Sequence, residues 1–136
     1  MTKHLSVSGI MKKEIHCVDA DRRVSEVAQE MRQLHIGAVM VKRGSEMAGI
    51  FTERDLLNRV VGMGTDPASI PVSAVMTAKF MCVSPDATVE VAAFLMHKRG
   101  FRHLPVKDEA GDVVGILSVR DVLAALAPEG GVASKP

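Results

Sequence analysis

The chain has 136 residues, of which 47% are hydrophobic and 24% charged, and its formal net charge is +1. This composition is typical of a soluble globular domain and too apolar for a disordered chain. The near-zero charge argues against nucleic acid or an anionic membrane surface as a partner, and no apolar run approaches the ~20 residues that cross a bilayer.

Motifs for secretion, metal binding and catalysis are missing from the sequence. Residues 1–16 lack a continuous apolar segment, so we expect no secretory signal. Two cysteines, Cys17 and Cys82, are too few for a disulfide framework, and we expect a cytoplasmic protein. The histidines lack the spacing of a metal site, and no P-loop, G-x-S-x-G or G-x-G-x-x-G motif occurs. We therefore expect no metal, no required cofactor and no enzymatic activity.

An internal repeat dominates the sequence. "GIFTERDLLNRV" begins at Gly49 and "GILSVRDVLAAL" at Gly115, an offset of 66 positions. Upstream, an offset of 65 aligns identical residues, among them Met11 with Met76, Cys17 with Cys82, Val41 with Val106 and Lys42 with Lys107. The change of offset falls in polar, glycine-containing segments at 42–49 and 107–115. Such an insertion is typical of a surface hairpin.

Both copies predict the same order of elements. In the first, the strand-like segment "IHCV" precedes a helical pattern, the strands "AVMV" and "AGIF", and a helix starting near Arg54. In the second, "FMCVS" precedes a helix, the strands "HLPV" and "VVGIL", and a helix starting near Arg120. The first helix of each copy is marked by apolar residues at helical spacing: Val24, Val27, Ala28, Met31 and Leu34, then Val89, Ala92, Ala93 and Met96. Each copy therefore reads β-α-β-β-α, in an α/β (α+β) fold.

The repeat also predicts the domain organisation. We assign residues 8–61 to the first repeat, 62–72 to a linker, 73–127 to the second repeat, and 128–136 to a frayed tail. A unit of about 55–60 residues is marginally stable alone, and its strands are apolar on both faces. We therefore expect the two copies to pack sheet to sheet about a pseudo-twofold axis, leaving symmetric clefts between them.

The chain resembles a pair of CBS domains, together called a Bateman module. The matching features are "SGIM" and "SAVM", "VSEVAQEM" and "VEVAAFLM", "GFRHLPV", and the two segments "GIFTERDLL" and "GILSVRDVL". Each is weak alone, but the ordered set occurs twice and covers about residues 8–126. The resemblance implies a regulatory module that binds adenosine-containing ligands in its clefts.

The repeated Thr/Ser-x-x-Asp pattern has two interpretations. A hydroxyl followed three positions later by an acidic residue is a capping box, which stabilises a helix start by about 1 kcal/mol. At the mouth of a cleft, the same geometry would let the helix amides bind a phosphate and let the carboxylate bind the vicinal hydroxyls of a ribose. The two roles can coexist. Because both copies carry Asp beside Arg, and given the resemblance, we favour ligand binding.

The resemblance implies that each Thr/Ser-x-x-Asp segment works with strand residues of the other repeat. In the first cleft the residues would be Thr52, Arg54, Asp55, Phe101, Arg102, His103 and Pro105, with Met81, Cys82 and Val83 lining the adenine pocket. In the second they would be Ser118, Arg120, Asp121, Ile36, Gly37 and Ala38, with His16, Cys17 and Val18 lining the pocket. Because Arg102 and His103 replace Gly37 and Ala38, we expect the first cleft to bind phosphorylated ligands more tightly.

These observations leave more than one function open. The favoured reading is a stand-alone, non-catalytic sensor of AMP, ADP or ATP that is a homodimer and signals to an unidentified protein. A module that prefers NAD or S-adenosylmethionine is an alternative. The other alternative is a ligand-free interaction or oligomerisation scaffold whose Thr/Ser-x-x-Asp pairs only cap helices.

Overall fold

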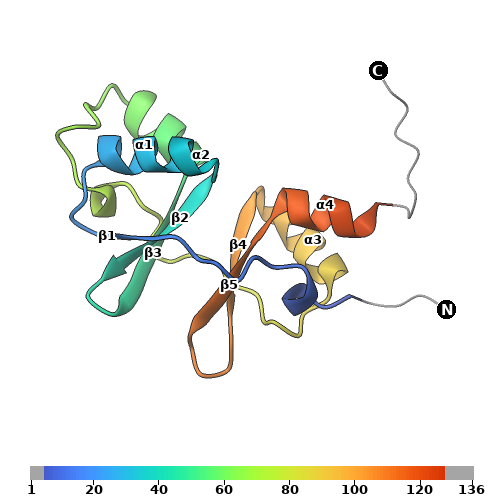
Figure 1. Ribbon diagram of the computed structural model, residues 1–136. Helices are drawn as coiled ribbons and strands as arrows, with labels where there is room; N and C mark the ends of the chain where they lie inside the picture. The colour runs from blue at the N-terminus through green and yellow to red at the C-terminus, as the bar shows by residue number, and fades with distance from the viewer. Residues whose placement is uncertain (1–4, 128–136) are drawn as a thin grey trace, which may run out of the picture. The chain divides into compact units, whose positions relative to one another are not determined.

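The computed structural model describes residues 5–127, which form two compact units. The first unit comprises residues 15–80, and the second unit comprises residues 5–14 together with 81–127. Each unit combines a small sheet with helices that cover one of its faces (Figure 1). The tail expected at 128–136 lies outside the described residues.

The sheet of the first unit has the order β1–β2–β3. β1 (Cys17–Asp19) pairs in parallel with β2 (Ala38–Arg43), and β2 forms an antiparallel hairpin with β3 (Glu46–Thr52). The crossover between the parallel strands is α1 (Val24–Leu34). Three of the five apolar residues predicted at helical spacing in α1 are buried, Val24, Val27 and Met31, and they share a core with Val39, Val41 and Phe51. Ala28 is half-buried, and Leu34, at the end of the helix, is exposed. The predicted β-α-β-β order is confirmed in this unit.

The last helix of the first unit is less regular than predicted. α2 (Glu53–Asp55) begins one residue before Arg54 and continues as a π-helix, η2 (Leu56–Val61). The wider turn is closed by the Gly62 N–H, which donates to the Leu57 carbonyl at 2.7 Å. In this geometry Val60 is buried in the core, while Leu57 and Val61 are exposed.

The second unit is built on one hairpin. β4 (His103–Lys107) pairs antiparallel with β5 (Val113–Ser118), and the register shifts between Val106 and Lys107 as it does between Val41 and Lys42 in the first hairpin. α3 (Val89–Arg99) ends at Gly100, whose φ of 72° suits glycine. α4 (Val119–Leu126) follows β5 directly and packs beside α3 (Figure 1).

One predicted strand does not form in the second unit. The segment "FMCVS" makes a single parallel bridge, between Val83 and Val106. The Val83 N–H donates to the Pro105 carbonyl at 3.0 Å, and the Lys107 N–H donates to the Val83 carbonyl at 2.9 Å. The segment therefore lies along β4 as β1 lies along β2, but its pairing is too short to add a third strand.

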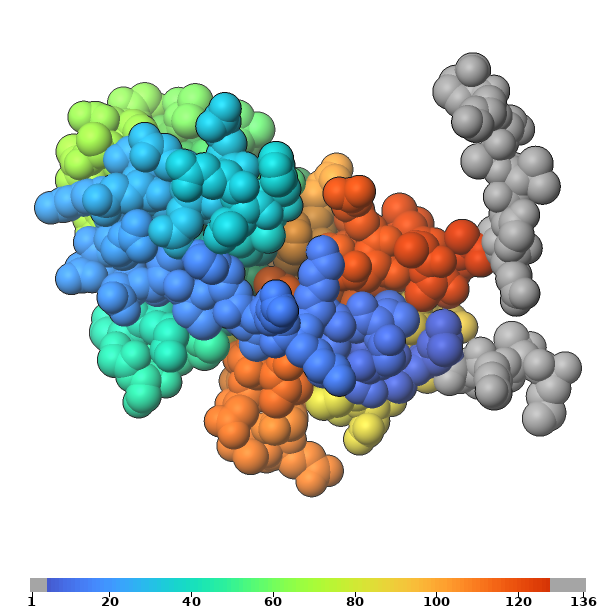
Figure 2. Space-filling view, in the orientation of Figure 1, coloured from blue at the N-terminus to red at the C-terminus, as the bar shows by residue number. Residues whose placement is uncertain are grey.

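Each unit is completed by a segment that sequence analysis assigned mostly to the other repeat. We call residues 5–14 the N-terminal strap and residues 70–80 the central strap. The N-terminal strap contains the 3₁₀ helix η1 (Val7–Gly9) and belongs to the second unit, where Lys12 and Ile116 exchange two backbone hydrogen bonds of 2.9 Å. Figure 2 shows this strap, in dark blue, against the α4 residues in red.

The central strap mirrors this arrangement in the first unit. It contains the 3₁₀ helix η3 (Val72–Ala74), and Thr77 exchanges backbone hydrogen bonds with Ile50 at 2.8 and 3.0 Å. The part of the predicted linker that precedes η3 is also attached to this unit, since the Val24 N–H donates to the Ile70 carbonyl at 3.1 Å. The predicted boundaries follow the sequence repeat, whereas the compact units exchange the straps.

The straps explain the glycine that opens each repeated motif. A Cβ on Gly49 would collide with the Met76 side chain and lie 2.9 Å from the Thr77 carbonyl oxygen. A Cβ on Gly115 would collide with Met11 in the same way and lie 3.0 Å from the Lys12 carbonyl oxygen. The methionines of "SGIM" and "SAVM" therefore pack directly on the backbone of β5 and β3.

Candidate functional site

Both Thr/Ser-x-x-Asp segments form capping boxes. In the first unit, the Asp55 N–H donates to Thr52 Oγ1 at 3.2 Å, and the Thr52 N–H donates to Asp55 Oδ2 at 3.0 Å. In the second unit, the Asp121 N–H donates to Ser118 Oγ at 3.1 Å, and the Ser118 N–H donates to Asp121 Oδ2 at 3.0 Å. The capping interpretation is confirmed for both copies, and each carboxylate is held at the first turn of its helix.

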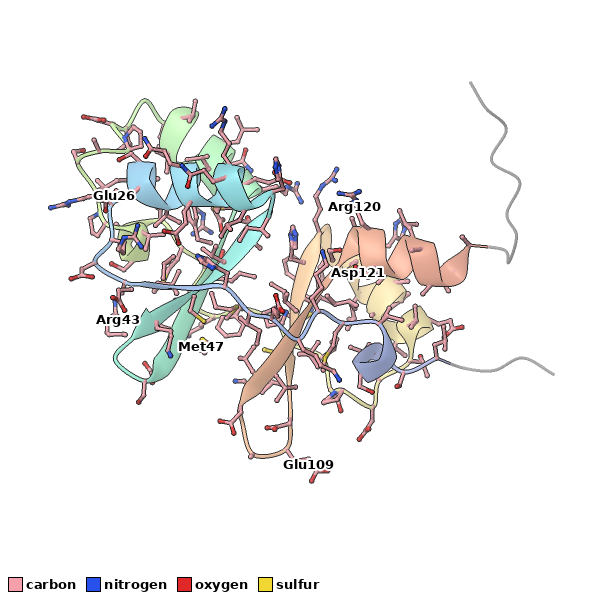
Figure 3. All side chains as sticks on the ribbon, viewed as in Figure 1. Glu26, Arg43, Met47, Glu109, Arg120 and Asp121 are labelled. Carbon is pink, nitrogen blue, oxygen red and sulfur yellow. The ribbon has the colours of Figure 1, made fainter. Side chains whose placement is uncertain are left out.

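The second unit gathers several chemistry-bearing side chains at this helix start. Ser118 lies opposite His103 in the β4–β5 pairing, and the Val119 N–H donates to the Arg102 carbonyl at 2.8 Å. Arg120 and Asp121 occupy the first turn of α4, beside the start of β4 (Figure 3). A hydroxyl, a carboxylate, an imidazole and two guanidinium groups are therefore carried on neighbouring backbone.

The corresponding position in the first unit is poorer in charge. Thr52 lies opposite Ala38, and the Glu53 N–H donates to the Gly37 carbonyl at 3.0 Å. Where the second unit has Arg102 and His103, this unit therefore has two residues without polar side chains. The charged groups near this helix start come from α2 and from Arg59 of η2.

The residues predicted to line the adenine pockets lie beside the first long strand of each unit. Val83 lies along β4 next to Pro105, as described above, and Met81 and Cys82 precede it. Cys17 and Val18 are in β1, and the Met40 N–H donates to the His16 carbonyl at 3.0 Å. Ile36 and Phe101 lie in the turns that lead into β2 and β4.

Within each unit, these contacts join the helix start to the strand of its own repeat. The second unit brings together Met81–Val83, Phe101–Pro105 and Ser118–Asp121. The first unit brings together His16–Val18, Ile36–Ala38 and Thr52–Asp55. The expected partnership of each helix start with strand residues of the other repeat stays a prediction.

Asp55 has two partners that sequence analysis missed. Its Oδ1 accepts a hydrogen bond from Thr77 Oγ1 at 3.4 Å and lies 3.6 Å from Arg59 Nε. Arg59 also donates through Nη1 to the Met76 carbonyl at 3.0 Å. The repeat alignment could have indicated that the two aspartates differ in their surroundings. It places Lys12 at the position of Thr77 and Ala125 at the position of Arg59.

His16 belongs to a charged cluster on the first unit. Its Nε2 is hydrogen-bonded to Glu30 Oε2, and Arg22 donates to Glu30 Oε1 at 3.2 Å. The hydrogen bond with His16, followed by the bond and charge of Arg22, lowers the pKa of Glu30. The His16 ring is thus engaged with α1.

The two cysteines lie in similar surroundings. Burial raises the pKa of the Cys17 thiol, and the Lys42 charge opposes this in part; burial likewise raises the pKa of Cys82, opposed by Lys107. A raised thiol pKa lowers the thiolate fraction at neutral pH, and thiolate is the reactive form. This favours the interpretation of both as small, partly buried hydrophobic residues.

Across residues 5–127, no cluster of three or more His, Cys, Asp or Glu side chains is arranged to hold a metal ion. Over the same residues, none of the helices has the length and apolar character needed to cross a membrane.

A family model described as CBS domain matches the chain twice, at residues 7–62 and 72–128. An uncharacterised protein of Methanopyrus kandleri is 32% identical over 122 residues, which are 89% of this chain and 62% of that protein. The CBS domain-containing protein YhcV of Bacillus subtilis is 31% identical over 117 residues, 86% of this chain and 82% of that protein. The chain thus spans less than two thirds of the Methanopyrus relative.

Solved structures of similar proteins share the fold. One, described as a signal-transduction protein with CBS domains from Burkholderia ambifaria, is 30% identical, with a TM-score of 0.85 over 90% of this chain and 93% of that one. A second, a CBS-CP12 protein from bloom-forming cyanobacteria, is described as hexameric; it is 27% identical, with a TM-score of 0.80 over 90% of this chain and 68% of that one.

Proposed function

Because this chain belongs to the CBS domain family and carries two copies of the domain, we propose that it is a non-catalytic regulatory module that binds AMP, ADP or ATP. In this proposal, a partner protein responds to whether the nucleotide is bound. The observation that carries the proposal is the set of complementary groups at the start of α4.

These groups match the parts of a nucleotide. The Asp121 carboxylate suits the two vicinal hydroxyls of a ribose, since a carboxylate accepts charge-assisted hydrogen bonds. Arg102, Arg120 and His103 suit a phosphate, and so do the backbone amides and dipole at the N-terminus of α4. The partly buried Met81 and Cys82 offer apolar surface for adenine.

Thermal unfolding with added ligand tests the proposal. AMP, ADP, ATP, NAD and S-adenosylmethionine should be compared, with CMP as a control that keeps the ribose phosphate and lacks adenine. A ligand at 100 times its dissociation constant should stabilise the folded chain by about 2.7 kcal/mol. Adenine nucleotides are expected to raise the Tm, and CMP is not. If none of the five ligands shifts the Tm, the ligand-free scaffold is favoured instead.

We further propose that the chain forms a homodimer through α3 and α4. These helices expose four large apolar side chains: Val91, Phe94, Leu123 and Leu126. Phe94 is 62% exposed, and a surface of this kind on adjacent helices is typical of a protein interface. The hexameric state described for the cyanobacterial CBS-CP12 protein supports self-association in this family.

The oligomeric state tests this second proposal. Phe94→Glu should convert the dimer to a monomer in sedimentation velocity, because it places a charge in an apolar contact. Gln29→Glu is the matched control, since Gln29 is exposed at the equivalent position of α1. A wild-type monomer, or a dimer that Phe94→Glu leaves intact, would contradict the proposed interface.

A further inference from the structure

The two aspartates of the repeated motif have different surroundings. Both use Oδ2 in the capping box, where Asp55 accepts from the Thr52 N–H and from Thr52 Oγ1 at 3.0 and 3.2 Å. Asp121 accepts from the Ser118 N–H and from Ser118 Oγ at 3.0 and 2.9 Å. The difference lies at Oδ1.

Oδ1 of Asp55 is occupied by the central strap and by η2. Thr77 Oγ1 donates to it at 3.4 Å, and Arg59 Nε lies 3.6 Å away. Asp55 therefore accepts three hydrogen bonds, from Thr52 N–H, Thr52 Oγ1 and Thr77 Oγ1, and forms an ion pair with Arg59. The Asp55 side chain is only 12% exposed.

These partners also fasten the central strap. Arg59 links Asp55 to the strap because its Nη1 donates to the Met76 carbonyl, and Thr77 adds the backbone pair with Ile50. For Asp55 Oδ1 to accept hydrogen bonds from a ligand, the hydrogen bond from Thr77 and the ion pair with Arg59 would have to be displaced. A ligand at this carboxylate would therefore have to compete with the packing of the unit.

Different residues stand near Asp121 at the positions of these two partners. Ala125 stands where the first unit has Arg59, and Lys12 stands where it has Thr77. The hydrogen bonds from Ser118 N–H and Ser118 Oγ both reach Oδ2 of Asp121 and leave Oδ1 on the other side of the carboxylate. The N-terminal strap is held to β5 here by the backbone hydrogen bonds between Lys12 and Ile116 and by the packing of Met11 on Gly115.

We infer that Asp55 is a structural carboxylate that fastens the central strap, and that Asp121 is the single ribose-binding carboxylate of the chain. The inference rests on the proposed nucleotide binding. It reverses the ranking expected from the sequence, in which the site containing Asp55 was the tighter one. Each chain then binds one adenine nucleotide at the start of α4, which carries Arg120 and is hydrogen-bonded to the backbone of Arg102.

Calorimetric titration of the full chain with AMP tests the inference, using Asp121→Asn and Asp55→Asn as a matched pair. The wild type should bind about one AMP per chain. Asp121→Asn should weaken binding by about tenfold or more, because it removes charge-assisted hydrogen bonds to the ribose. Asp55→Asn should leave the affinity within about twofold and lower the Tm of the ligand-free protein more than Asp121→Asn does.

Two further measurements keep the test decisive. Thr77→Val removes one hydrogen bond to Asp55 while keeping the shape of the side chain, and it should lower the Tm without changing AMP affinity. Thr77→Val replaces Asp55→Asn in the test if Asp55→Asn does not fold. 2′-Deoxy-AMP should bind the wild type more weakly than AMP, and this difference should disappear in Asp121→Asn.

The outcomes separate the inference from the proposed function. Two AMP molecules per chain, or equal losses of affinity in folded Asp55→Asn and Asp121→Asn, would overturn the inference while nucleotide binding stands. A wild type that binds none of AMP, ADP and ATP in the same titration would overturn the proposed function. In that case equal Tm values for the two ligand-free variants would also overturn the structural role of Asp55.

Discussion

Helices α1 and α3 hold the same place in the two units but present different side chains. Charged or ionisable residues of the first unit align with apolar residues of the second: Arg22 with Ala87, Glu26 with Val91, Glu30 with Leu95, and His16 with Met81. In the first unit these groups form ion pairs and hydrogen bonds centred on Glu30. In the second unit Val91 and the nearby Phe94 are exposed apolar residues.

The two straps, in contrast, make the same contacts in both units. Met11 on Gly115 and Met76 on Gly49 form the same contact in both units, down to the neighbouring carbonyl. The repeat is therefore identical at this contact, because a Cβ on either glycine would overlap the methionine and crowd a carbonyl oxygen. It differs where side chains meet solvent, and at the groups around Asp55 and Asp121. The duplication thus keeps one scaffold while giving its two copies different surface chemistry.

The largest expected loss of stability comes from truncating a core side chain, and it compares the hydrophobic cores of the two units. Phe51 in β3 and Leu117 in β5 occupy equivalent positions, and both are fully buried. Phe51→Ala should lower the free energy of unfolding by about 3–5 kcal/mol and Leu117→Ala by about 2–5 kcal/mol, because each leaves a cavity. Urea denaturation measures both. The exposed Leu57→Ala should stay within about 0.5 kcal/mol, and a comparable loss there would contradict the assignment of the core.

An intermediate effect tests whether the straps are equivalent. Gly49→Ala and Gly115→Ala should each lower the free energy of unfolding by about 1–3 kcal/mol, since the added Cβ overlaps a methionine and crowds a carbonyl oxygen. The control is Gly9→Ala, because a Cβ at this position meets no atom within 4 Å. A large loss at one glycine and none at the other, in urea denaturation, would break the equivalence.

The smallest expected effect is confined to the first unit and depends on pH. His16 and Arg22 hold the folded-state pKa of Glu30 below its ordinary value of 4.5. The stabilisation is therefore present above about pH 4.5 and is lost as the pH falls through the folded-state pKa. Glu30→Gln should make the chain less stable at neutral pH and flatten the acid dependence of its unfolding free energy.

The control for this pH dependence lies in the second unit. Glu109 is exposed in the β4–β5 turn, and Glu109→Gln should leave the acid dependence unchanged. If Glu109→Gln flattened the curve as much as Glu30→Gln, general charge rather than the contacts of Glu30 would control acid stability.

Sequence patterns were sufficient to predict the elements that are determined by residues close together in the chain. The spacing of Val24, Val27 and Met31 predicted α1 and its buried face, and the pattern ending in Asp121 predicted the capping box of α4. The "FMCVS" segment was misjudged, because its apolar composition matches that of β1 while only Val83 finds a partner. The π-turns of η2 were also missed, since the apolar spacing there suits an α-helix as well.

The sequence by itself determined the twofold repeat, the order of elements and the polar groups at each helix start, because these follow from residues a few positions apart. Only the tertiary structure decided which strap completes which unit and which aspartate is occupied. The bond from Thr77 to Asp55 spans 22 positions, and local patterns carry no information on such a contact. The packing of Met76 on Gly49 holds the central strap against β3, and this places Thr77 within hydrogen-bonding distance of the Asp55 carboxylate.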